Sequence, residues 1–222
     1  VFPADHHIQP PDRCAETMET AFRAAALAPV LVTLGIAPAG PSVEYGYIEA
    51  GDREGEAGGI PWHAVRAFHE KPDLKTAEGF VASGRHLWNA GIFCFRADVL
   101  GKAVEAHLPE LAAVLAPIAA AAGTEAFPAR MKEGFPKAPA VSIDYGVLEK
   151  ASNLKVVRAD FSWDDVGSWL ALERLHGKDA AGNVVLGEAL SVDSRGLILA
   201  SEPGHLIAAV GRQDLVVVTT KD

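Results

Sequence analysis

Four short segments of the sequence place polar side chains directly after apolar runs. They are residues 3–6, 70–72, 87–91 and 163–169. Ligands of α/β proteins bind beyond the carboxyl ends of the strands, so side chains at such points are candidates for chemistry. The segments offer carboxylates, an ammonium group and an amide, which suit a metal ion, a phosphate and sugar hydroxyls.

Two of these segments carry the aspartates that could hold a metal ion. Asp5 directly follows what reads as the end of an apolar strand, and a carboxylate there can bind a hard cation such as Mg²⁺, which prefers oxygen ligands. A turn or helix-capping role is the commoner alternative for such an aspartate. Asp164 and Asp165 are adjacent, so their side chains point in different directions and at most one faces a given metal. The other is expected to cap a helix that begins near Ser168.

The other two segments could recognise a phosphorylated sugar. Glu70 can accept hydrogen bonds from hydroxyls and Lys71 can neutralise a phosphate, although a solvated loop is the alternative. Asn89 can donate to a hydroxyl and accept from it at once, or it can be a turn residue. Gly46 lies between two tyrosines, where its backbone could approach a ligand closely or form a bulge.

The apolar pattern predicts the elements that must position these residues. A helix is predicted over 12–27, with Met18, Phe22 and Ala25 on its buried face, and a buried strand over 30–34. The helical region 97–122 is expected to break at Pro109 and at Pro117. Strands and helices alternate in this way as far as residue 176, which favours an α/β layer architecture.

The pattern changes after residue 177, where only short β-type runs separated by turn residues remain. We therefore expect an α/β domain over 1–176 and a small β-rich unit over 177–222. Val1 and Phe2 look like the end of a buried strand, so we expect the beginning of the domain to be missing from this chain.

Composition excludes several classes of function. The formal charge of −9 argues against binding a nucleic acid polymer, which requires a basic face. No apolar run approaches the roughly 20 residues that a membrane helix needs, so no membrane is expected as a partner. The two cysteines make no disulfide framework, which favours reduced thiols and a cytoplasmic protein.

Eight segments follow one another in a recognisable order. They are Pro3-Ala4-Asp5-His6, Thr33-Leu34-Gly35-Ile36, Tyr45-Gly46-Tyr47-Ile48, Phe68 with Glu70-Lys71-Pro72, Leu87-Trp88-Asn89-Ala90-Gly91, Ser142-Ile143-Asp144-Tyr145-Gly146-Val147-Leu148-Glu149-Lys150, Asp165-Val166-Gly167-Ser168-Trp169 and Gly182-Asn183-Val184. Together they resemble the mannose-1-phosphate guanylyltransferase family of sugar nucleotidyltransferases.

The resemblance implies a Rossmann-like nucleotidyltransferase domain followed by a β-helical C-terminal portion. It implies that mannose 1-phosphate and GTP react to give GDP-mannose and pyrophosphate, with Mg²⁺ as cofactor. A homodimer is a further expectation. The resemblance implies metal binding for Asp5 and Asp165. It implies contact with the sugar hydroxyls for Glu70 and Asn89, and a place near the sugar phosphate for Lys71. It further implies a close backbone approach for Gly46, and supporting positions beside the substrate for Asp144 and Lys150.

The sequence departs from the family pattern at one important point. Family members begin with a loop containing Gly-x-Gly-Thr-Arg that wraps the phosphates of GTP, and nothing in the 222 residues matches it. We therefore expect these residues alone to be inactive. A non-catalytic regulatory subunit that keeps the sugar pocket, or a transferase for another sugar 1-phosphate, stays open as an alternative. The presence of both Asp5 and Asp165 favours the enzyme.

Overall fold

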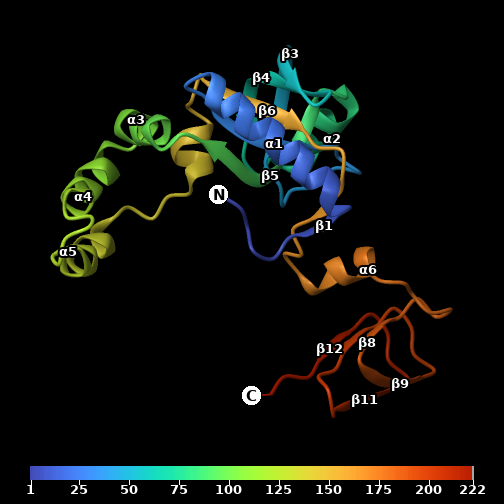
Figure 1. Cartoon of the computed structure of the whole chain (residues 1–222). Helices are drawn as coiled ribbons and strands as arrows, with labels where there is room; N and C mark the ends of the chain where they lie inside the picture. The colour runs from blue at the N-terminus through green and yellow to red at the C-terminus, as the bar shows by residue number, and fades with distance from the viewer. Residues whose placement is uncertain (222) are drawn as a thin grey trace. The chain divides into compact units, whose positions relative to one another are not determined.

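The computed structural model describes residues 1–221, which divide into two compact units (Figure 1). The first contains residues 1–4 and 8–163, and the second contains residues 5–7 and the chain from Asp164 onward. The domain boundary near residue 177 stays a prediction.

A mixed β-sheet that closes on itself forms the centre of the first unit. Its strands, in spatial order, are β2 (Leu31–Ile36), β5 (His86–Phe95), β3 (Tyr47–Ala57), β4 (Ile60–His69) and β6 (Leu154–Arg158). β2 and β6 are parallel and the other neighbours are antiparallel. Every residue of β2 is buried, as its continuous apolar run predicts. The expected α/β class is confirmed as a mixed α/β fold.

Helix α1 (Pro11–Leu27) packs on this sheet through small side chains. Ala21, Ala24 and Ala25 are buried against core residues of β2 and β5. The prediction that Phe22 lies on the buried face is wrong, since this side chain is 59% exposed. Alanines allow the helix to approach the sheet more closely than a phenylalanine would. The helix therefore presents its alanines to the sheet and Phe22 to solvent.

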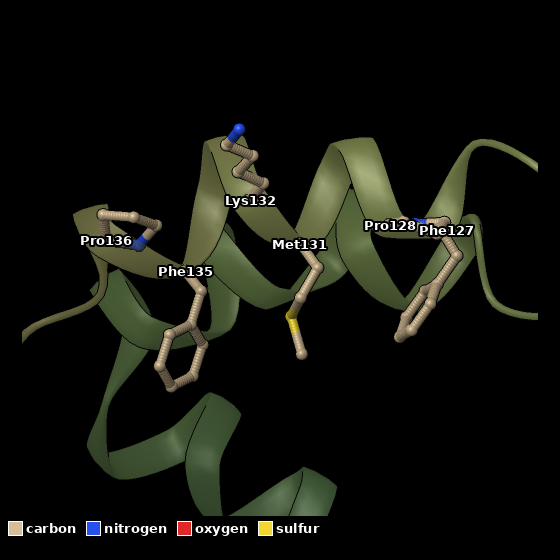
Figure 2. A pocket seen from close by; sticks show the side chains of 6 residues that line it. All are labelled: Phe127, Pro128, Met131, Lys132, Phe135 and Pro136. Atoms are coloured by element: carbon tan, nitrogen blue, oxygen red, sulfur yellow. The ribbon is translucent and has the colours of Figure 1, made fainter.

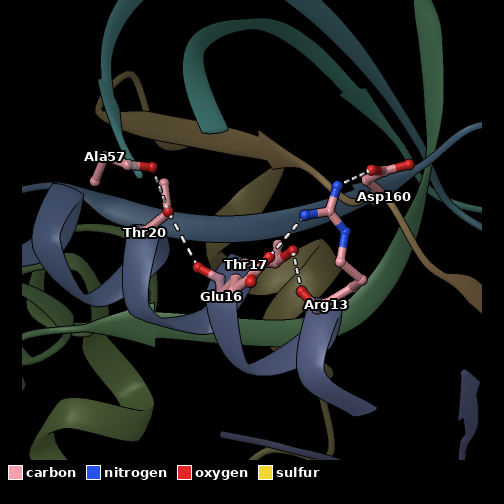
Figure 3. Close-up of polar contacts among 6 residues, drawn as sticks. All are labelled: Arg13, Glu16, Thr17, Thr20, Ala57 and Asp160. Atoms are coloured by element: carbon pink, nitrogen blue, oxygen red, sulfur yellow. Dashed lines mark hydrogen bonds and ion pairs between the residues drawn. The ribbon is translucent and has the colours of Figure 1, made fainter. Parts of the chain in front are cut away.

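Polar contacts also tie α1 to the sheet (Figure 3). The Thr20 hydroxyl lies 3.0 Å from the carbonyl oxygen of Ala57 at the end of β3. Arg13 forms an ion pair with Asp160, which follows β6. The Thr17 hydroxyl donates to the carbonyl oxygen of Arg13 within the helix, at 2.7 Å. These contacts give each buried hydroxyl a partner.

The remaining helices of the first unit are α2 (Leu74–Ser83), α3 (Ala97–His107), α4 (Pro109–Ala120) and α5 (Phe127–Gly134), followed by a 3₁₀ turn (Phe135–Lys137) and a π-helix (Asp144–Leu148). The predicted break at Pro109 is confirmed, because α3 ends and α4 begins there. The break predicted at Pro117 is wrong, because this proline lies inside α4, which continues to Ala120. α5 was not predicted.

Val1 and Phe2 lie outside any strand and are 73% and 50% exposed, so the expected buried strand end is not found. Val1 nevertheless exchanges two backbone hydrogen bonds with Phe93 of β5, at 2.8 and 3.0 Å. Two short strands, β1 (His7–Gln9) and β7 (Ser162–Asp164), pair in a separate two-stranded sheet.

The second unit continues with a 3₁₀ turn (Trp169–Ala171), α6 (Leu172–Leu175), and the strands β8 (Val184–Leu186), β9 (Glu188–Val192), β10 (Ile198–Ala200), β11 (Leu206–Val210) and β12 (Val216–Val218). β10 pairs in parallel with both β8 and β12, and β11 pairs in parallel with β9. The predicted β-rich C-terminal portion is therefore confirmed, and its β-helical form stays a prediction.

Candidate functional site

Five of the residues singled out in the sequence converge in the first unit. Gly46 precedes β3, Glu70 and Lys71 follow β4, Asn89 lies in β5, and Asp144 begins the π-helix. The Asn89 backbone N–H donates to the carbonyl oxygen of Gly46 at 2.8 Å, and the Asn89 Nδ2 atom donates to Asp144 Oδ1 at 3.0 Å. Lys71 Nζ lies 3.7 Å from Glu70 Oε1. We refer to these five residues as the carboxylate–amide cluster.

The absence of a side chain at Gly46 leaves space for the Glu70 carboxylate. A Cβ atom at residue 46 would lie 2.5 Å from Glu70 Oε2 and 3.4 Å from Asn89 Cβ. The first distance is shorter than any ordinary contact, so a larger residue would displace the carboxylate. Gly46 thus lies close to the Glu70 side chain, and its close approach to a ligand stays a prediction.

Burial dominates the electrostatics of the cluster. The Glu70 side chain is only 11% exposed. Burial raises the pKa of Glu70 and the nearby Asp144 charge raises it further, while Lys71 opposes both effects. Burial also raises the pKa of Asp144, against the lowering effect of the hydrogen bond from Asn89. Carboxylates held in this way cost folding energy, which is typical of groups kept for binding or catalysis.

Two further residues belong to this region, and sequence reasoning did not assign them to it. Glu149 Oε1 accepts a hydrogen bond from the backbone N–H of Glu70 at 3.2 Å, and it also raises the pKa of Glu70. The Thr33 hydroxyl lies 2.9 Å from Asn89 Oδ1. A hydroxyl inside a fully buried strand must find a partner, and that rule could have pointed to Thr33.

The backbone at Lys71 is also unusual. Its φ is 44°, in the left-handed region that residues with a side chain seldom adopt. Such conformations persist only where the surroundings impose them, and they gather at functional sites. Here the hydrogen bond from Glu70 to Glu149 on one side and Pro72 on the other restrict the turn that carries the ammonium group.

The two aspartates predicted to bind metal belong to the second unit. Asp5 precedes β1 and Asp165 follows β7, the two strands that pair with each other. Residues 5–7 group by their contacts with the chain from Asp164 onward, although about 160 residues separate them in sequence. Asp5 is exposed, and Asp165 is half-buried and accepts a hydrogen bond from the Gly167 N–H at 3.3 Å.

Asp164 has a different role from its neighbour. It is 7% exposed and receives two hydrogen bonds from Arg174 of α6, at 2.5 and 3.0 Å, and one from the Val166 N–H at 2.9 Å. Burial alone would raise the pKa of Asp164, but the Arg174 and Val166 hydrogen bonds outweigh it and the pKa is lowered. The prediction that Asp164 caps a helix near Ser168 is wrong, because it forms an ion pair with the side chain of the following helix instead.

The donor set fits a divalent cation that is completed by other ligands. Within residues 1–221, no group of three or more histidine, cysteine, aspartate or glutamate side chains is arranged to hold a metal ion. Asp5 and Asp165 alone would supply two carboxylates. Mg²⁺ is commonly held by one or two carboxylates together with water and substrate phosphates, whereas structural zinc requires four protein ligands. Asp5 and Asp165 therefore supply the kind of oxygen ligand that a divalent cation takes.

Two surface hollows share no lining residue with the carboxylate–amide cluster. The first is lined by Phe127, Pro128, Met131, Lys132, Phe135 and Pro136 (Figure 2). The second is lined by Arg23, Ala26, Leu27, Glu56, Ala57 and Trp62. The first is almost wholly apolar, and neither brings together carboxylates and an amide as the cluster does. In residues 1–221, no helix is both long and apolar enough to span a bilayer.

Comparison with known proteins agrees with the resemblance that the motifs indicate. The chain is 36% identical to a mannose-1-phosphate guanylyltransferase of Sinorhizobium fredii (strain NBRC 101917 / NGR234), with 100% of this chain and 42% of the relative covered. It is 38% identical to the xanthan biosynthesis protein XanB of Xanthomonas campestris pv. campestris (strain B100), covering 100% and 46%. The chain thus spans less than half the length of these curated relatives.

A solved structure is similar over the whole chain. It is described as a mannose-1-phosphate geranyltransferase from Thermus thermophilus, with a TM-score of 0.83, 35% identity, and coverage of 100% of this chain and 62% of that one. The family model described as nucleotidyl transferase matches residues 1–182, which include the carboxylate–amide cluster and both aspartates that are predicted to bind metal. This chain therefore belongs to the nucleotidyl transferase family.

Proposed function

We propose that the protein containing this chain transfers the guanylyl group of GTP to mannose 1-phosphate. The observation that carries the proposal is the convergence of Glu70, Asn89 and Asp144 beside Lys71, which suits a sugar bearing both hydroxyls and a phosphate. The name of the relative with 36% identity supports the choice of mannose 1-phosphate and GTP.

The reaction requires two anions to meet. An oxygen of the sugar phosphate attacks the α-phosphorus of GTP, a new P–O bond forms, and the bond to the bridging oxygen breaks to release pyrophosphate. Positioning and charge neutralisation account for most of the rate enhancement in such a transfer. Lys71 would offset the charge of the sugar phosphate, while Glu70 and Asp144 would hold the sugar by accepting hydrogen bonds from its hydroxyls.

Nucleotidyl transferases generally use divalent metal ions, and we propose Mg²⁺ for this protein. Asp5 and Asp165 would hold it, supported by their place in the same compact unit and by their chemistry. The cation would neutralise phosphate charge. The two unpaired thiols, Cys14 and Cys94, agree with a cytoplasmic location. The homodimer stays a prediction.

We further propose a Rossmann-like nucleotidyltransferase domain followed by a β-helical portion. The match of residues 1–182 to the family supports the first part. The second is supported by the alternation of two parallel ladders along the chain, in which β10 pairs with β8 and β12 while β11 pairs with β9.

The proposed activity can be tested by measuring pyrophosphate release from the complete natural protein with Mg²⁺. GTP with mannose 1-phosphate should give the highest kcat/KM, compared with GTP and glucose 1-phosphate or UTP and mannose 1-phosphate. A preference for another pair would identify a transferase for that pair. Binding of mannose 1-phosphate in calorimetry without any pyrophosphate release would instead indicate the non-catalytic subunit.

Replacing Gly46 with alanine should weaken the use of the sugar phosphate with little loss of stability. The added methyl group displaces the Glu70 carboxylate, whose far end can rotate at a cost of about 1 kcal/mol. We expect KM for mannose 1-phosphate to rise several-fold and KM for GTP to stay constant. Gly40→Ala is the matched control, because a Cβ there has nothing within 4 Å. Equal kinetics for the two variants would show that Glu70 does not need this space.

The pH dependence of KM for mannose 1-phosphate should also show the protonation of Glu70. Because burial and neighbouring carboxylates raise its pKa, the carboxylate becomes protonated earlier than usual as pH falls, and it then loses strength as an acceptor. We expect the ratio of KM for mannose 1-phosphate in Glu70→Gln to that in wild type to shrink between about pH 8 and pH 5. Titration of the substrate phosphate is common to both proteins and cancels in this ratio. A ratio that is constant across this range would contradict the raised pKa.

A further inference from the structure

The side-chain amide of Asn89 is almost fully committed to protein partners. Its Oδ1 accepts hydrogen bonds from the Gly91 N–H at 3.2 Å and from the Thr33 hydroxyl at 2.9 Å, and its Nδ2 donates to Asp144 Oδ1 at 3.0 Å. An amide offers two acceptor sites and two N–H hydrogens. Within the described residues, these three contacts occupy both acceptor sites and leave one N–H.

A bulge brings Thr33 within reach of this amide. Thr33 pairs with Phe93 and Gly35 pairs with Asn89, so residues 90–92 of β5 lie opposite a single residue of β2. Gly91 adopts a φ of 67° in this bulge, and its N–H points to Asn89 Oδ1. The fully buried Thr33 hydroxyl is 2.9 Å from Asn89 Oδ1 and 3.3 Å from the Ile92 carbonyl oxygen. Since the hydroxyl has one hydrogen, the shorter distance assigns it to Asn89.

We propose that Thr33 is a positioning residue that holds the Asn89 amide in place, while Asp144 and the Gly91 N–H set its orientation, so that Asn89 acts towards the sugar only as a donor. The pocket would then select a sugar 1-phosphate in which one hydroxyl accepts from Asn89 and a neighbouring hydroxyl donates to Glu70. This inference rests on the proposed function and makes it more specific. It differs from the dual donor and acceptor role that the sequence suggests for Asn89.

The opposite orientation of the amide is unfavourable because of its neighbours. After a flip, Oδ1 would face the Asp144 carboxylate and Nδ2 would face the Gly91 N–H. Both contacts would then join groups of the same kind, acceptor to acceptor and donor to donor. Without the Thr33 hydroxyl the amide keeps its orientation but loses a constraint on its position, so its remaining N–H is aimed less accurately at the sugar.

Isosteric substitution tests this role in the complete natural protein. Thr33→Val removes the hydroxyl and keeps the shape, Thr33→Ser keeps the hydroxyl, and Thr17→Val removes another fully buried threonine hydroxyl that bonds only within α1. We expect Thr33→Val to raise KM for mannose 1-phosphate about 3- to 10-fold, the usual worth of one hydrogen bond. KM for GTP should not change, and Thr33→Ser should stay close to wild type. Equal effects on both substrates, or none on the sugar phosphate, would overturn the proposal.

A second measurement does not depend on turnover. In protein labelled with ¹⁵N at asparagine, the Asn89 side-chain amide signal, assigned by its loss in Asn89→Asp, should shift or broaden in Thr33→Val and not in Thr17→Val. If wild type fails to use mannose 1-phosphate, the proposed function fails, yet this signal still decides whether Thr33 controls Asn89. An Asn89 signal that is identical in wild type and Thr33→Val would reject the inference.

Discussion

Replacing Asp165 with asparagine should lower kcat for pyrophosphate release by on the order of 100- to 1,000-fold. Asparagine keeps the size of the side chain and removes its charge, so the fold around β7 should survive. A metal ion contributes several kcal/mol of charge stabilisation to such a transfer, and each 1.36 kcal/mol corresponds to a tenfold change in rate. Steady-state assays across a range of Mg²⁺ concentrations would measure the loss, together with a rise in the concentration needed for half-maximal activity.

Asp160→Asn provides the matched control for this experiment. Asp160 lies five residues upstream, is 76% exposed and pairs with Arg13 on the surface, so its substitution should leave kcat within about twofold. Asp5→Asn should reproduce the Asp165→Asn defect, because both carboxylates would serve one cation. If Asp165→Asn were damaging and Asp5→Asn harmless, the shared metal site would be wrong.

The strands that carry the site could be predicted from the sequence, because apolar runs and the polar residues that follow them both indicate the same strands. The apolar run of β2 and the polar residues that follow β4 locate the sheet and its ends, and Glu70, Lys71 and Asn89 do converge. Their partners are harder to foresee. Thr33 looks like one more β-branched residue in a buried strand, and only the bulge in β5 brings its hydroxyl to Asn89.

The errors have a common physical origin in tertiary packing. Periodicity placed Phe22 on the buried face of α1, but the sheet accepts only the small alanines beside it. Proline propensity predicted a break at Pro117, but α4 continues through it and ends within a turn. The capping rule assigned Asp164 to a helix end, whereas Arg174 supplies a charged partner that no local pattern reveals.

Replacing Glu70 with glutamine should raise KM for mannose 1-phosphate by about 10- to 100-fold, the range expected for a hydrogen bond to a charged group. Glutamine has the same shape and one acceptor oxygen fewer, and it cannot accept from a sugar hydroxyl as strongly as a carboxylate. KM for GTP should change little, because the charges that act on Glu70 are those of Lys71 and Asp144 in the carboxylate–amide cluster and of the adjoining Glu149. None of these residues is assigned to GTP. Initial rates with each substrate varied in turn would separate the two effects.

The thermal stability of Glu70→Gln provides a control. Replacing a carboxylate that supports the fold lowers Tm, whereas replacing one that is kept for binding leaves Tm unchanged or raises it. The folded-state pKa of Glu70 is raised, so the folded protein binds its proton more tightly than the unfolded chain does. This group therefore costs stability as pH rises from the unfolded pKa through the folded pKa, and the full cost is present at neutral pH. Glu70→Gln removes that cost, and its Tm at pH 7 should equal or exceed that of wild type.

Glu19→Gln, at a residue 65% exposed and paired with Arg23 on α1, should change neither KM nor Tm appreciably. A Glu70→Gln protein with a lowered Tm and an unchanged KM for the sugar phosphate would show that Glu70 supports the fold and does not hold the sugar.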